Sequence, residues 1–236
     1  MSIGFDRVSS LPALSLLCAL GNVAALAEVP PSPRFGTAVE SFIPTGYSPI
    51  AQEQADFNGD GRLDVVLVVA SKADPDADRP LLILFRRPSG GFVLSHRSDR
   101  AIPERATGGI ASPDGFAGLR VERNTFLIAE YGGSSVRSST RWRFRFQDGD
   151  WFLIGETLRL DGAGVECLNP KLAGDRECLG YQIDTNFLTG RQIIKHDYHD
   201  LAADQDRTQM IRRTVRVEKL VRLVDFEPRP WAAIPQ

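Results

Sequence analysis

The stretch that decides the fold is Ala55-Asp56-Phe57-Asn58-Gly59-Asp60-Gly61-Arg62-Leu63-Asp64, followed directly by Val65-Val66-Leu67-Val68-Val69. The second part is apolar and rich in β-branched residues, so it predicts a buried β-strand. The first part places oxygen-bearing side chains at alternate positions of a loop that its glycines allow to turn sharply. The stretch therefore predicts a polar loop that leads into a core strand.

The polar loop has the ligand spacing of a cation site. Side chains at places 1, 3, 5 and 9 and the backbone carbonyl at place 7 supply oxygen, while Gly61 permits the turn at place 6. The expected ligands are Asp56, Asn58, Asp60, Arg62 and Asp64. Oxygen ligands without His or Cys favour calcium over zinc or copper. Three aspartates this close would repel one another without a cation. The alternative is an Asx-rich hairpin turn without a metal.

This loop resembles the calcium loop of FG-GAP and VCBS-type repeats, in which Asp-x-Asn-x-Asp-Gly-x-x-Asp precedes a strand rich in Val and Ile. Residues 56–64 match that motif at every constrained place. An EF-hand differs, because helices flank its loop on both sides. The resemblance implies a calcium site. Propellers are built from several such repeats, and this sequence carries one copy of the loop. The resemblance therefore implies at most an incomplete set of propeller-like blades.

The first 27 residues predict export. Arg7 gives a positive start, residues 11–27 are apolar and small, and Ala25-Leu26-Ala27 is a signal-peptidase cleavage pattern. The apolar run is interrupted by Pro12 and Gly21 and is short for a membrane span. We expect cleavage before Glu28, no membrane span afterwards, and a periplasmic or secreted protein. The alternative is a buried N-terminal helix.

Two cysteines remain after the expected cleavage, Cys167 and Cys178. In an oxidising compartment two such residues are expected to pair. The disulfide would close a polar loop of turn-forming residues and stabilise the fold by about 2–3 kcal/mol. Free thiols, or a metal pair completed by His, are the alternatives.

Composition and length indicate an ordinary globular chain. Of 236 residues 42% are hydrophobic, enough for a core, and the net charge of −2 gives no reason to expect a nucleic-acid partner. We expect four segments along the chain. They are a signal peptide at 1–27, an extended lead-in at 28–35, one β-rich domain at 36–227 and a proline-rich tail at 228–236.

The β-rich domain is expected to be antiparallel. Short apolar or alternating runs recur at intervals of 8–12 residues with turn signals between them, among them Asp148-Gly149 and Thr189-Gly190. A short helix is expected at 35–42, and a polar connection at 201–208. Expected strands are 48–57, 65–69, 81–85, 92–96, 119–122, 125–130, 141–146, 151–155, 181–188, 191–198, 213–219 and 220–226. These twelve segments, which we expect to form on the order of ten strands, predict a meander or a sandwich-like curved sheet, with incomplete propeller-like blades as the alternative.

Further short motifs resemble a loosely defined group of uncharacterised exported bacterial β-rich proteins. The motifs are the loop at 56–64, Tyr131-Gly132-Gly133-Ser134-Ser135, Trp151-Phe152-Leu153-Ile154 and Phe187-Leu188-Thr189-Gly190. The match spans roughly residues 42–226. It implies an exported β-rich protein and no particular activity.

The strand expected at 141–146 carries a candidate ligand face. Its arginines alternate with aromatic residues, so they point to one side of the strand about 7 Å apart. Facing a glycine-serine turn, they could hold an anion through guanidinium and amide hydrogen bonds. The candidate residues are Arg141, Arg143, Arg145, Gly132, Gly133 and Ser134. The partner would be a protein or an anionic envelope ligand. The alternative is a solvated face whose arginines pair with neighbouring acids.

One cluster suggests an enzyme. His196 and His199 lie three residues apart beside Asp197 and Asp200, but on a strand side chains at this spacing diverge. We therefore expect an exported, non-enzymatic, calcium-stabilised binding protein of unknown partner. The alternative is a small periplasmic hydrolase that uses the His196–His199 cluster.

Overall fold

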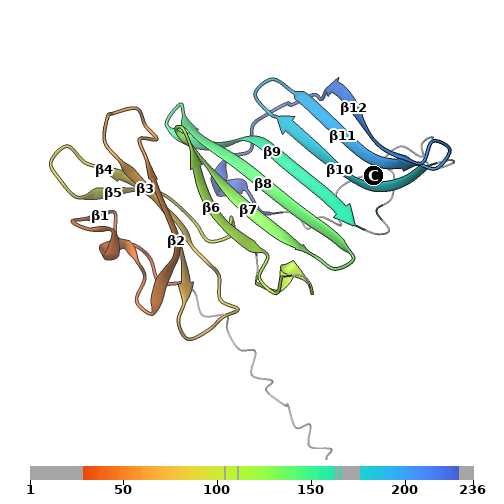
Figure 1. Cartoon of the computed structure of the whole chain (residues 1–236). Coiled ribbons are helices and arrows are strands. Elements are labelled where there is room, and N and C mark those ends of the chain that lie inside the picture. Colours follow the sequence, from red (N-terminus) through yellow and green to blue (C-terminus); the bar gives the residue numbers. More distant parts are fainter. Residues whose placement is uncertain (1–28, 104, 111, 163–164, 166–175, 229–236) are drawn as a thin grey trace, which may run out of the picture.

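The computed structural model describes residues 29–103, 105–110, 112–162, 165 and 176–228, and these residues form two antiparallel sheets (Figure 1). The predicted mainly-β, antiparallel fold is confirmed. Two sheets of five and seven strands that share a hydrophobic core match the sandwich-like prediction better than four-stranded propeller blades. In the described ranges no helix is long and apolar enough to cross a membrane.

The five-stranded sheet has the strand order β1-β5-β4-β3-β2. Its strands are β1 Phe35–Gly36, β2 Tyr47–Ala55, β3 Asp64–Ser71, β4 Leu81–Arg86 and β5 Phe92–Ser98. Strand β3 is buried from Asp64 to Ala70, as its apolar run predicts. Val66 and Val68 face the other sheet, whereas Leu67 faces a second cluster closed by Phe42 of the 3-10 helix η1, Val39–Phe42.

The helix predicted at 35–42 is wrong for its first half. Residues Phe35–Gly36 pair with Val93 and Phe92 as a short edge strand, and only Val39–Phe42 are helical. Pairing with β5 takes these two residues into the sheet. The chain at Gly36 lies so close to η1 that an added Cβ there would be 2.7 Å from the ring of Phe42.

The seven-stranded sheet has the order β12-β11-β10-β9-β8-β7-β6 and is a meander of consecutive hairpins. Its strands are β6 Phe116–Glu122, β7 Thr125–Gly133, β8 Val136–Gln147, β9 Asp150–Gly162, β10 Arg176–Asn186, β11 Arg191–Asp200 and β12 Gln205–Thr214. The 3-10 helix η2, Arg105–Gly108, precedes it. The predicted turn between β8 and β9 is confirmed, with positive φ at Asp148 (52°) and Gly149 (81°).

The predictions for the end of the chain are wrong in part. Residues 205–208, predicted as part of a polar connection at 201–208, belong to β12. Of the strands predicted at 213–219 and 220–226, only residues 213–214 are in a strand, and residues 215–222 are unpaired apart from a single bridge between Arg222 and Phe152. The 3-10 helix η4, Leu223–Asp225, follows. Leu223 and Phe226 are buried between the sheets, so this segment closes the core and does not extend a sheet.

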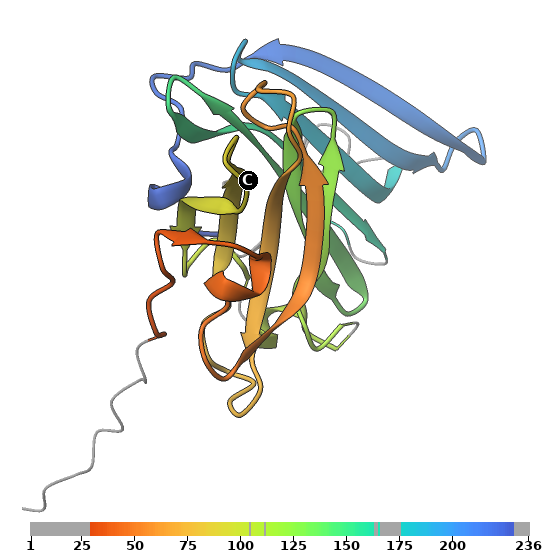
Figure 2. The same cartoon turned by 90° about the vertical axis from the view of Figure 1, so that its left-hand side faces the viewer.

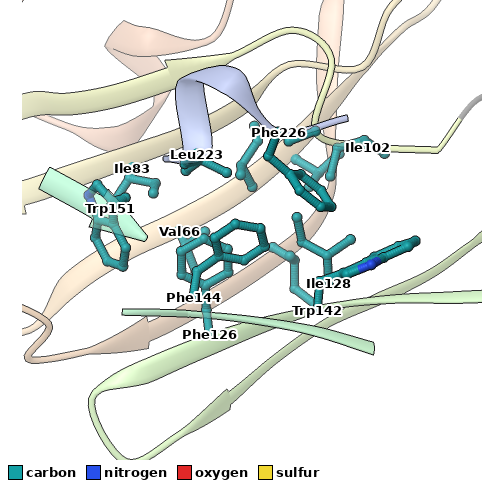
Figure 3. Close-up of a cluster of buried hydrophobic side chains, with 14 of the residues drawn as sticks. Val66, Ile83, Ile102, Phe126, Ile128, Trp142, Phe144, Trp151, Leu223 and Phe226 are labelled. Carbon is teal, nitrogen blue, oxygen red and sulfur yellow. The ribbon is translucent and has the colours of Figure 1, made fainter. Parts of the chain in front are cut away.

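Aromatic residues fill the space between the sheets (Figure 3). Phe126 stacks on Phe144 with ring centroids 5.2 Å apart, and Trp142 meets Phe226 edge to face at 5.5 Å. At one side of the sandwich, the edge strand β2 of the five-stranded sheet lies beside the edge strand β6 of the seven-stranded sheet. Figures 1 and 2 show that strands β10–β12 extend past this shared core, away from the five-stranded sheet.

Candidate functional site

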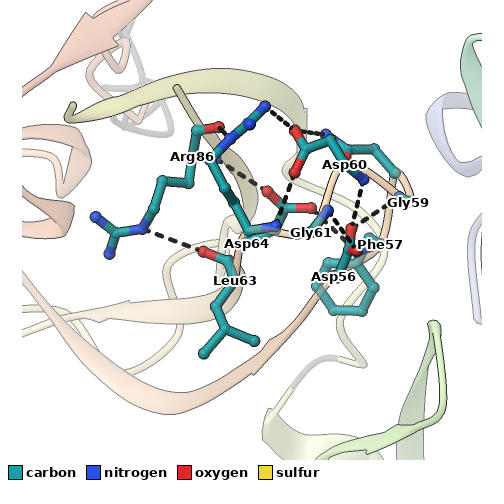
Figure 4. A network of polar contacts seen from close by, with 10 residues as sticks. Asp56, Phe57, Gly59, Asp60, Gly61, Leu63, Asp64 and Arg86 are labelled. Carbon is teal, nitrogen blue, oxygen red and sulfur yellow. Dashed lines mark hydrogen bonds and ion pairs between the residues drawn. The ribbon is translucent and has the colours of Figure 1, made fainter. Parts of the chain in front are cut away.

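The loop between β2 and β3 is held by its own backbone amides (Figure 4). The carboxylate of Asp56 accepts three hydrogen bonds, at 2.7, 3.1 and 2.8 Å, from the N–H groups of Gly59, Asp60 and Gly61. The N–H of Gly61 contributes most to holding the pKa of Asp56 below its ordinary value. Both Gly59 and Gly61 have positive φ, 78° and 81°, which explains the glycines of the motif.

The last predicted ligand, Asp64, is fully buried at the start of β3. Its two oxygens accept the N–H groups of Phe57 at 3.0 Å and of Arg86 at 2.9 Å. Burial, and then the nearby charges of Asp60 and Asp56, raise the pKa of this carboxyl above its ordinary value. Asp64 makes no ion pair with any described residue, so no basic side chain offsets its buried charge.

Asp60 and Arg62 face each other across the turn. The Asp60 carboxylate accepts the N–H of Arg62 at 2.9 Å and also pairs with the Arg62 guanidinium, while Asn58 Oδ1 accepts the N–H of Asp60 at 3.0 Å. In this arrangement the described part of the chain has no group of three or more His, Cys, Asp or Glu side chains gathered for a metal. The donor set itself, three carboxylates with an amide and a carbonyl from one loop, fits the chemistry of calcium.

The loop is anchored in the core by Phe57, which is 2% exposed. Its ring meets Phe126 at 6.2 Å and Trp151 at 5.4 Å, both edge to face, and both partners belong to the seven-stranded sheet. One loop residue thus contacts the opposite sheet while its N–H binds Asp64. The conformation of the loop and the packing of the two sheets are therefore coupled.

The structure separates the two halves of the predicted ligand face. Arg141 lies opposite Ala129 in the β7–β8 pair, whereas Gly132 and Gly133 lie opposite Ser138 and Arg137, farther along the strands. Ser134 follows directly in the turn between β7 and β8. The predicted arrangement, with the arginines facing these three turn residues, is not found.

The arginines also differ in what they contact. Arg143 binds Glu122 at 2.6 Å and the hydroxyl of Thr125 at 3.1 Å, and Arg145 binds Gln147 at 3.0 Å. Arg141 is exposed and makes no ion pair within the described ranges. Two of the three arginines of the predicted ligand face are thus already engaged within the sheet.

The two histidines of the enzyme hypothesis point to opposite faces of β11. His196 is buried and has its pKa lowered, chiefly by burial. His199 lies 2.8 Å from Asp206 and 3.3 Å from Asp204, and the hydrogen bond to Asp206 is the main cause of its raised pKa. The pair shares no ligand or substrate position.

Several predictions fall outside the described residues. Cys178 lies in β10, but Cys167 is not among the residues that the structure describes, and neither are the signal segment 1–27 and residues 229–236 of the tail. The disulfide, the signal peptide and the tail stay predictions.

Glu130, which the sequence did not indicate as a site residue, lies beside a cavity at the edge of the hydrophobic core. Glu130 of β7 faces the same way as Phe126 and Ile128 and lines a cavity of about 450 Å³ with Asp78, Asp99, Glu227 and others. Burial raises its pKa to about 7. Alternation along the strand was the available signal, since it places an acid at a position where the core face expects an apolar residue.

Comparison of the chain with protein-family models, with curated proteins and with solved structures finds no match. The likeness to FG-GAP and VCBS-type repeats stays a prediction from residues 56–64.

Proposed function

We propose that this protein is an exported, non-enzymatic binding module whose β sandwich is stabilised by calcium at the loop of residues 56–64. The observation that carries the proposal is the buried carboxylate of Asp64, which has two other aspartates nearby and no basic partner among the described residues. Bound calcium would supply the missing positive charge. Asp56, Asn58, Asp60 and Asp64 would hold it through side-chain oxygens and Arg62 through its carbonyl.

The proposed cation has a structural role because of where the loop is anchored. Phe57 joins the loop to the aromatic core of the other sheet, so ordering the loop also orders the contact between sheets. A ligand present at about 100 times its dissociation constant stabilises the folded state by about 2.7 kcal/mol. For a chain of this size that corresponds to a shift in Tm of roughly 5–10 °C.

A binding role is favoured over hydrolysis by the histidine geometry. His196 is buried on one face of β11 and His199 pairs with two aspartates on the other, so the cluster supplies no base beside a shared substrate position. The solvent face of the seven-stranded sheet carries exposed cationic side chains instead. Arg141, Arg159, Lys195 and Arg212 belong to this set. An anionic partner fits such a face.

The test is thermal unfolding of the mature protein with calcium and with a chelator. We expect the chelator to lower Tm by several degrees in the wild type, and Asp60→Ala to remove that difference. Asp76→Ala, an exposed aspartate in the β3–β4 loop, is the matched control and should respond to the chelator as the wild type does. Equal melting curves of the wild type with and without chelator would refute the calcium role.

A further inference from the structure

Two rows of side chains cross strands β9–β12 on the solvent face of the seven-stranded sheet. Their register is fixed by the pairing of the strands. The first row is Arg159, Gln182, Lys195 and Met210, and the second is Asp161, Gly180, Asp197 and Thr208. Leu158, Leu160 and Ile194 point to the opposite face and are buried. The two rows therefore stand on the side that faces away from the core.

The charged members of the rows form a rectangle. Neighbouring strands are about 4.8 Å apart and same-face residues along a strand about 7 Å apart. Arg159 and Lys195 thus define one edge about 10 Å long, and Asp161 and Asp197 define the parallel edge about 7 Å away. A cavity of about 420 Å³ lies within this frame.

Gly180 keeps the carboxylate edge of the cavity open. It sits between Asp161 and Asp197 in its row and contributes no side chain. A Cβ at this position would lie 2.6 Å from the backbone oxygen of Leu160, so the site does not accept a larger residue without moving the strand. The pairing of β9 with β10 thus requires a glycine at this position, and the cavity is not filled by a side chain there.

The cationic edge is available to a ligand. Lys195 is exposed and makes no ion pair with the described residues. Arg159 contacts Asp161 at 3.2 Å, but both side chains are about half exposed, and such pairs contribute little. Arg141 and Arg212 stand in the adjacent row, with Asp184 between them, and add positive charge. The two cations and two carboxylates of the rows balance, and the adjacent row leaves the face with an excess of one positive charge, which favours a ligand with net negative charge.

The carboxylate edge restricts what the anionic ligand can be. Asp197 already accepts the hydroxyl of Thr208 at 2.6 Å, which shows the kind of hydrogen bond this edge makes. Carboxylates repel a bare phosphate but accept hydrogen bonds from hydroxyl groups. Met210 and Leu179, 42% and 37% exposed, offer apolar surface at the rim. A ring that carries one carboxylate, several hydroxyls and a C–H face satisfies all three features.

We propose that this cavity binds an acidic sugar unit of an anionic polysaccharide. The sugar carboxylate lies at Arg159 and Lys195, the hydroxyls donate to Asp161 and Asp197, and neighbouring acidic units of the polymer meet the arginines of the adjacent row. The inference rests on the proposed function, since it names the ligand of the binding module.

The test is calorimetric titration of the calcium-loaded protein with a galacturonate hexasaccharide. We expect saturable binding that Lys195→Gln and Asp197→Asn each weaken at least tenfold. Lys72→Gln, which removes an exposed lysine from the other sheet's loop, is the control and should bind as the wild type does. Both rows are needed, so a loss with Lys195→Gln alone would overturn the role of the carboxylate edge.

Two comparison ligands separate the alternatives. Equal affinity for a neutral glucose hexasaccharide would overturn the role of the cations, and equal affinity for polyglutamate would replace the sugar by an acidic peptide. No binding of the galacturonate hexasaccharide to the wild type would overturn the inference. Failure of the calcium proposal is seen separately, because it appears as a melting curve that the chelator leaves unchanged.

Discussion

Replacement of Glu130 by Gln is expected to stabilise the protein above about pH 4.5, with the full effect above about pH 7, and to have no effect at lower pH. Burial raises the pKa of Glu130 from 4.5 to about 7, so the folded state favours the neutral form. Below pH 4.5 the carboxyl is protonated in both folded and unfolded chains and makes no difference. As pH rises towards 7 the unfolded chain loses this proton first, so the free energy of unfolding falls, and above 7 the loss is complete.

The size of the effect follows from the two pKa values. The change from 4.5 to about 7 corresponds to about 3 kcal/mol, and partial exposure of the side chain reduces this to roughly 1.5 kcal/mol. Urea unfolding at pH 4 and pH 8 measures it. Glu130→Gln should exceed the wild type by that amount at pH 8 and equal it at pH 4. Glu40→Gln, at an exposed position of η1, should change neither value. A destabilised Glu130→Gln variant at pH 8 would refute the reasoning and indicate that the ionised carboxyl has a favourable partner.

Three other variants test the core and the polar contacts. Phe57→Ala removes the aromatic link between loop and opposite sheet and should lower the free energy of unfolding by about 3–5 kcal/mol in urea denaturation. Asp114→Ala leaves the guanidinium of Arg79, 4% exposed, without the carboxylate that it binds at 2.7 and 2.8 Å; because Asp114 is 37% exposed and Arg79 keeps the carbonyl of Pro103, the cost should be about 1–3 kcal/mol in the same assay. Asp206→Asn should lower the pKa of His199 in an NMR titration, because the carboxylate stabilises the imidazolium, and an unmoved pKa would contradict that hydrogen bond.

The predictions that succeeded came from local patterns that the structure keeps. The apolar run after Asp64 becomes a strand buried on both faces. Asp148-Gly149 forms the predicted hairpin turn, and both residues have the positive φ that this turn needs. The alternation at 141–146 also holds, with Trp142 and Phe144 in the core and Arg141 exposed. In each case neighbouring residues alone determine the outcome, so a single sequence is sufficient.

The predictions that failed depend on distant residues. Strand β12 has no apolar alternation strong enough to identify it, because its ten residues lie at the edge of a sheet and are mostly exposed. Residues 215–221, predicted within strands, are not in a sheet, and the chain after them places Leu223 and Phe226 between the sheets. The rows that contain Arg159 and Asp161 exist only through the successive pairing of β9 with β10, β10 with β11 and β11 with β12, which no local pattern specifies.

Strand β12 is an edge strand of the seven-stranded sheet, and among the described strands it pairs only with β11. Unpaired borders of this kind invite other chains to add to them and start aggregation. Three arginines, Arg207, Arg212 and Arg213, stand on this border with a single acid, Asp206, so two copies that approach edge to edge bring like charges together. The polar sequence that makes β12 hard to recognise as a strand therefore also disfavours the addition of a second copy at that border.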